Sequence, residues 1–95
     1  MRITQGETDL LKTGIVSVLP EAKVYLFGSR ADDTQKGGDI DVLILANRRL
    51  DWKEKSKIRW SFAEEFGEQK IDLVSFTFQE ENNFKQLALT GGVEL

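Results

Sequence analysis

Residues 26–45 read LFGSRADDTQKGGDIDVLIL, and this stretch decides which fold and which chemistry the chain can support. An apolar segment ends at Gly28 and Ser29, a polar loop with two further glycines follows, and Asp39 and Asp41 open a second apolar segment. Residues two apart on a strand project from the same face, so the two carboxylates lie on one face. Two unit charges about 4 Å apart repel by roughly 4 kcal/mol at an effective dielectric near 20, and a divalent cation removes that repulsion. The stretch therefore predicts a Mg²⁺ site at the start of a strand, since Mg²⁺ prefers carboxylate oxygens and keeps positions open for substrate phosphates.

Hydrophobic periodicity and capping signals in the rest of the chain predict alternating helices and strands. We expect a helix over residues 8–19, strands over 23–27, 39–45 and 70–74, and a helical turn within the loop near residues 30–33. Asp51 and Glu54 form a capping box for a helix that ends at Gly67, and Thr77 with Glu80 gives a similar signal for a last helix ending at residues 91–92. Residues 93–95 would return to the sheet edge. This order predicts one α/β (α+β) domain over residues 1–95, with three to four strands packed against helices.

Composition excludes several classes of site and partner. The chain has no cysteine and no histidine, so the usual zinc ligands are missing and a general base must be a carboxylate, lysine, tyrosine or water. A net charge of −3 does not favour nucleic acid as a partner, because such binding depends on clustered Lys and Arg. No apolar run approaches the roughly 20 residues that cross a bilayer, and no signal pattern is present at the N-terminus, so we expect a cytoplasmic protein without a membrane partner.

A third acid completes the candidate site. Asp72 lies in the strand predicted at residues 70–74, between Ile71 and Leu73. If that strand lies beside residues 39–45, the strand spacing of about 4.8 Å brings Asp72 within reach of the first two acids. Three acids around two cations form a layout for phosphoryl or nucleotidyl transfer, with Asp72 as the best candidate for accepting the proton of the attacking hydroxyl.

The segment before the acids can bind the phosphates of a nucleotide. Gly28 lets the backbone approach a ligand closely because it has no Cβ. Ser29 offers a hydroxyl and an amide to a phosphate oxygen, and Arg30 can donate two hydrogen bonds to one phosphate.

At these residues the sequence resembles the minimal nucleotidyltransferases of the DNA-polymerase-beta-like superfamily, whose signature is Gly-Ser, a loop, Asp-x-Asp and a later Asp. The resemblance rests on GSRADDTQKGGDID and KIDLV and covers nearly the whole chain. It implies a small mixed sheet, ATP and two Mg²⁺ ions, and transfer of AMP to a hydroxyl on a small helical HEPN-type partner encoded nearby, so that the chain acts as an antitoxin. The implied nucleotide-binding residues are Gly28, Ser29 and Arg30, and the implied catalytic and metal-binding residues are Asp39, Asp41 and Asp72.

Other functions stay open at this point. Asp32-Asp33 follow Ala31 where relatives often have Arg-Gly, so the chain could be an antitoxin that acts by complex formation alone. Trp60 supports that alternative, because it falls about 140° from the apolar stripe of the helix at residues 51–67 and is an interface candidate. A nucleotidyltransferase subunit for small molecules such as antibiotics, and an α/β domain with incidental acids, are lesser alternatives. A homo-oligomer is also open.

Overall fold

The computed structural model describes residues 3–31 and 38–95. Asp32 and Asp33 lie outside the described residues. The elements follow along the chain as α1 (Gln5–Val18), β1 (Lys23–Phe27), the 3₁₀ turn η1 (Gly28–Arg30), β2 (Ile40–Ala46), α2 (Trp52–Phe66), β3 (Ile71–Thr77), α3 (Asn83–Gly91) and β4 (Val93–Glu94). The predicted α/β fold with a small mixed sheet is therefore confirmed.

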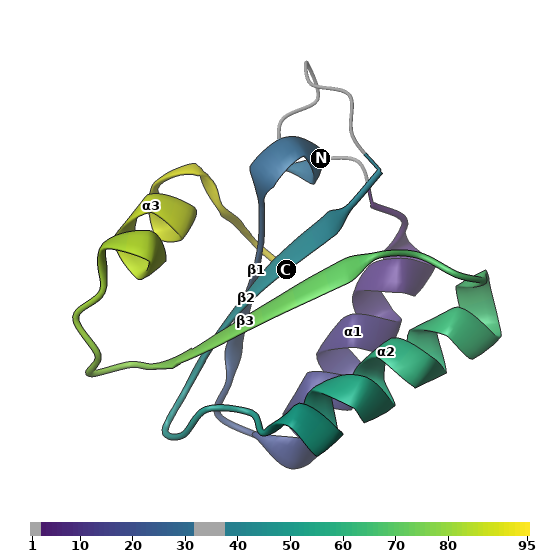
Figure 1. Ribbon diagram of the computed structural model, residues 1–95, viewed down its shortest axis with the longest axis horizontal. Helices are drawn as coiled ribbons and strands as arrows, with labels where there is room; N and C mark the ends of the chain where they lie inside the picture. Colours follow the sequence, from purple (N-terminus) through teal and green to yellow (C-terminus); the bar gives the residue numbers. More distant parts are fainter. Residues whose placement is uncertain (1–2, 32–37) are drawn as a thin grey trace.

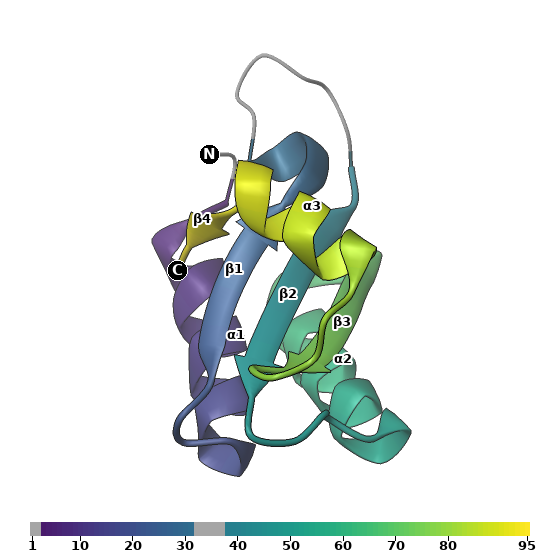
Figure 2. The same cartoon turned by 90° about the vertical axis from the view of Figure 1, so that its left-hand side faces the viewer.

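The sheet has four strands in the order β3-β2-β1-β4 among the described residues (Figures 1 and 2). β1 pairs antiparallel with β2 and with the short β4, while β2 and β3 pair in parallel through the α2 crossover. The predicted return of the chain end to the sheet edge is confirmed by β4. This order makes β2 a central strand, with the glycine turn on one side of its first residues and β3 on the other.

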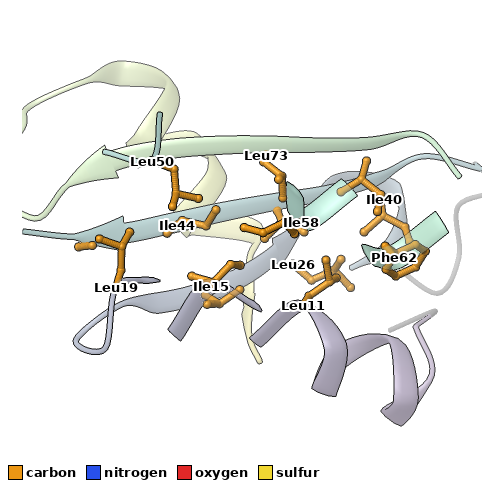
Figure 3. Close-up of a cluster of buried hydrophobic side chains, with 14 residues drawn as sticks. Leu11, Ile15, Leu19, Leu26, Ile40, Ile44, Leu50, Ile58, Phe62 and Leu73 are labelled. Carbon is orange, nitrogen blue, oxygen red and sulfur yellow. The ribbon is translucent and has the colours of Figure 1, made fainter. Parts of the chain in front are cut away.

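Helices cover the two faces of the sheet unequally. α1 and α2 lie together on one face, and α3 crosses the opposite face (Figures 1 and 2). The two-helix face holds the larger core, in which side chains from both helices meet those of β1, β2 and β3 (Figure 3). Phe62 of α2 and Leu11 and Ile15 of α1 are buried there against Ile40 and Leu26. Alternation along each strand then leaves the odd-numbered residues of β1 and β2 and the even-numbered residues of β3 on the α3 face.

Local capping fixes where the helices begin, and it corrects two boundaries. α1 begins earlier than predicted, because Thr4 caps it in a reciprocal box with Glu7. α2 begins as predicted, with Asp51 and Glu54 exchanging hydrogen bonds. The box predicted at residues 77 and 80 also forms, but it closes the turn after β3, and Asn82 is the residue that caps α3.

Further boundaries differ from the predictions, and β2 begins at Ile40 instead of residue 39, so Asp39 lies just before the strand. β3 runs on to Thr77 instead of ending at residue 74, because each of its residues from Ile71 pairs with one in β2. The helical turn expected near residues 30–33 lies earlier, at Gly28–Arg30. Within the described part of the chain, every helix is too short or too polar to cross a bilayer.

Candidate active site

Asp41 and Asp72 lie side by side at the start of two neighbouring parallel strands. Each is the second residue of its strand, and the two are direct register partners. Partners in a parallel ladder share a face, and alternation with buried Ile40 and Ile71 places both carboxyls on the α3 face. The predicted proximity of Asp72 to Asp41 is therefore confirmed.

The pKa of Asp41 is raised from its ordinary value. Partial burial of the carboxyl is the largest cause, followed by the hydrogen bond with Asp72 and by the negative charges of Asp72 and Asp39; Lys70 opposes the shift. Like charges held close together disfavour ionisation. Asp41 thus lies where a cation would be stabilising.

Gly28 brings the chain backbone against the carboxyl of Asp41. It follows Phe27, the register partner of Asp41 in β1, and its φ of 72° lies in the left-handed region. A Cβ added at this position would overlap Oδ2 of Asp41. Both the conformation and the space require glycine here, so the backbone of the turn lies directly against the carboxyl of Asp41.

The arginine of the turn holds the two ends of the loop together. Nη2 of Arg30 donates to the carbonyl oxygen of Gly38 at 3.1 Å, and Nε2 of Gln69 donates to the same oxygen. The backbone of Ser29 belongs to η1. The phosphate-binding roles of Ser29 and Arg30 stay predictions.

Asp39 is engaged by a lysine. Its Oδ2 lies 3.5 Å from Nζ of Lys70, and both side chains are about half exposed or more. Among residues 3–31 and 38–95, no three histidine, cysteine or acidic side chains gather closely enough to hold a metal ion. The structure therefore brings Asp41 and Asp72 together and pairs Asp39 with Lys70, and a site made by all three acids stays a prediction.

The ion pair between Asp39 and Lys70 was not among the sequence predictions, although the sequence contains a signal for it. The segments Asp39-Ile40-Asp41 and Lys70-Ile71-Asp72 run in parallel register, with the two isoleucines paired. Extending that register by one residue places Lys70 beside Asp39, and the amide of Ile40 indeed donates to the carbonyl of Lys70 at 3.0 Å. Aligning the two segments as neighbouring strands would have revealed the pair.

A surface groove lies beside the edge strand, between α2 and the residues that enter β3. Its volume is about 690 Å³, and its lining includes Arg59, Trp60, Gln69 and Lys70. Trp60 is 68% exposed, as its off-stripe position predicted, and its Nε1 donates to Glu64. Lys70 belongs both to this groove and to the ion pair with Asp39, so the groove adjoins the acidic site.

The chain matches one protein family model and is similar to a known protein. The model of the family described as "Polymerase beta, Nucleotidyltransferase" matches residues 17–95. The chain is similar to the probable protein adenylyltransferase MntA of Haemophilus influenzae, with 26% identity over 81 residues, which are 84% of this chain and 71% of that protein.

Solved structures show the same fold. One is the complex of a tri-AMPylated Shewanella oneidensis HEPN toxin with MNT antitoxin, in which a chain matches at a TM-score of 0.68 with 22% identity, covering 97% of this chain and 71% of its own length. A toxin-antitoxin structure with AMP-PNP matches at 0.69 with 25% identity, covering 90% of this chain and 69% of its own length. Both structural matches confirm the predicted fold class.

Proposed function

Because the chain belongs to the polymerase-beta nucleotidyltransferase family, we propose that it transfers AMP from ATP to a hydroxyl of a partner protein. The observation that carries this proposal is the juxtaposition of Asp41 and Asp72 beneath the Gly28 turn. Two carboxyls facing a close-approaching backbone suit a ligand that carries both cations and phosphates. The similar protein from Haemophilus influenzae, named as a probable protein adenylyltransferase, supports the same reaction class.

The residues present fit a Mg²⁺ ion. Carboxylate oxygens are its preferred protein ligands. The pKa of Asp41 is raised first by burial and then by Asp72 and Asp39, and a bound cation would stabilise the ionised carboxylate against these effects. Asp41 and Asp72 would hold the ion. Asp39 would also bind it after giving up its ion pair with Lys70. When bound, Mg²⁺ would neutralise phosphate charge and orient the nucleotide, and two ions would suit the family layout.

The chain's own residues would bind the nucleotide, orient it and remove one proton. Gly28, Ser29 and Arg30 would hold the triphosphate tail at the turn. The acceptor oxygen forms a new bond to the α-phosphorus, the bond from that phosphorus to the bridging oxygen breaks, and pyrophosphate leaves. Asp72 would accept the proton of the attacking hydroxyl, since no histidine is available in this chain.

A small helical HEPN-type protein is the acceptor that the comparisons favour. A structure similar to this chain contains an AMPylated HEPN toxin with MNT antitoxin. We therefore place this chain as the antitoxin of such a pair, acting by modifying its partner.

Labelled ATP tests the proposal. The purified chain is incubated with Mg²⁺, α-labelled ATP and the product of the neighbouring gene, and label on that product is expected. Asp41→Asn and Asp72→Asn should abolish labelling, whereas Glu65→Gln, which removes an exposed charge on α2, should retain it. Equal labelling by wild type and Asp41→Asn would exclude the proposed site, and no labelling by either would exclude this acceptor.

Neutralisation by complex formation alone is the second candidate, and the exposed Trp60 favours it. An indole that is 68% exposed beside a groove is a suitable interface anchor. Trp60→Ala should then abolish binding to the partner, while Asp41→Asn should leave binding and neutralisation intact. Loss of neutralisation in Asp41→Asn with binding retained would reject this candidate in favour of the enzyme.

A further inference from the structure

An aromatic ring on α3 lies at the edge of the candidate active site. Phe84 belongs to the first turn of α3, on the sheet face that carries Asp41 and Asp72. Its ring packs against Phe27 in an edge-to-face arrangement, with centroids 5.7 Å apart and planes at 84°. Phe84 is nevertheless 48% exposed, so a large part of the ring is available for another contact.

Strand register connects this ring to the acids. Phe27 is the direct partner of Asp41 in the β1–β2 ladder and immediately precedes Gly28. Register partners on one face have Cβ atoms roughly 5 Å apart. A single side chain, that of Phe27, therefore separates the Phe84 ring from the carboxyl of Asp41 and from the glycine turn.

The helix that presents Phe84 is firmly anchored at this end. Lys85, only 5% exposed, donates through Nζ to the carbonyl oxygens of Thr77, Phe78 and Glu80 at 3.2, 2.9 and 2.9 Å. The side chain of Asn82 accepts from the backbone amides of Phe84 and Lys85. Figure 2 shows α3 crossing the sheet face as a single outer layer. The ring is thus a fixed platform and not a loosely held surface residue.

We propose that Phe84, supported by Phe27, is the surface on which the nucleobase of the bound nucleotide stacks. The inference rests on the proposed function, because it takes the phosphates to lie at the acids and the glycine turn. A nucleobase is joined to its α-phosphate through one sugar, so an aromatic ring one side chain away from the acids is suitably placed. Stacking on an aromatic ring serves any base, and it contributes affinity without hydrogen-bond recognition.

A docking surface for a protein explains this ring less well. On α3 the large exposed apolar side chains are Phe84 and Leu87, and Asn83 and Gln86 beside them are exposed and polar. Two apolar residues make a much smaller patch than the several hundred square ångströms typical of interaction sites. A single flat ligand ring matches the available surface better.

Paired titrations separate stacking on the base from binding of the phosphates. The affinities for a non-hydrolysable ATP analogue and for inorganic triphosphate, both with Mg²⁺, are measured by calorimetry for wild type, Phe84→Leu, Phe84→Trp and Leu87→Ala. Phe84→Leu keeps an apolar side chain but removes the π face. It should bind the analogue about tenfold more weakly, which corresponds to about 1.4 kcal/mol, with triphosphate binding unchanged.

The other variants sharpen the result. Phe84→Trp should bind the analogue as tightly as wild type or more tightly, and Leu87→Ala should stay within about twofold for both ligands. Equal analogue affinity for wild type and Phe84→Leu would overturn the stacking surface while leaving the proposed function intact. Equal affinity of wild type for the analogue and triphosphate would also overturn it. Wild type that binds neither ligand would reject the proposed function and this inference together.

Discussion

Asp41→Asn should stabilise the metal-free protein while abolishing its response to Mg²⁺. Asp41 and Asp72 are register partners on adjacent strands, which lie about 4.8 Å apart. At that separation two unit charges repel by about 3.5 kcal/mol at an effective dielectric of 20 and by about 0.9 kcal/mol in water. Since Asp41 is only partly buried, solvent screening favours the lower value, and we expect a gain of about 1 kcal/mol.

The substituted side chain adds a second favourable effect. An asparagine at position 41 carries an N–H donor at every pH, so it can hydrogen-bond to the carboxylate of Asp72 without first binding a proton. For a domain of this length, 1 kcal/mol raises Tm by about 4–8 °C. The assay is thermal unfolding followed by circular dichroism at pH 7.5, once in EDTA and once in excess Mg²⁺.

The pH dependence has a definite sign. The pKa of Asp41 is raised in the folded chain, so the folded state binds this proton more tightly than the unfolded state. The free energy of unfolding of the metal-free wild type should therefore rise as pH falls from 7.5 toward that raised pKa. This added stability should disappear again as pH rises. Glu54 and Glu80, whose pKa values are lowered to about 2, oppose this trend only below about pH 4.5.

Three outcomes follow for the wild type, Asp41→Asn and the charge control Glu65→Gln. In EDTA at pH 7.5, Asp41→Asn should melt several degrees above the other two, and this gain should shrink as the pH falls toward the raised pKa of Asp41. In Mg²⁺, the wild type and Glu65→Gln should rise in Tm, because the ion binds the folded state, and Asp41→Asn should not. A Tm of Asp41→Asn equal to or below that of wild type in EDTA would refute the argument from charge repulsion.

Three further substitutions test how the site is supported. Gly28→Ala should lose binding of the ATP analogue in calorimetry and about 1–3 kcal/mol of stability, because its Cβ would overlap Asp41 and its φ is positive; retained binding would contradict the close approach. Ser75→Ala should cost about 1–3 kcal/mol in urea unfolding with little effect on labelling, since its buried Oγ accepts from the amide of Leu50 at 2.8 Å. Lys85→Met should cost about 2–3 kcal/mol in the same assay, because it leaves the carbonyls that end β3 without their buried donor; an unchanged midpoint would show that water replaces the ammonium.

The sequence alone determined the features whose causes are local. The helix start at Asp51 follows from a capping box of four residues, from Asp51 to Glu54. The alternation of Asp41 with Ile40 and Val42 predicted that its carboxyl would lie on the face opposite these two buried side chains. Local stereochemistry and a strand period of two were sufficient for these conclusions, because neither depends on residues far along the chain.

Only the tertiary structure decided which distant groups became partners. The pairing of Asp39 with Lys70 depends on the register between β2 and β3, and the contact of Phe27 with Phe84 depends on the face that α3 covers. The capping box at residues 77 and 80 predicts a helix start but closes a turn, because α3 begins only after Asn82, where Lys85 anchors it to the end of β3. Such contacts join segments that are separated in sequence. Their geometry is fixed by how the core packs, and a short stretch of sequence does not determine that packing.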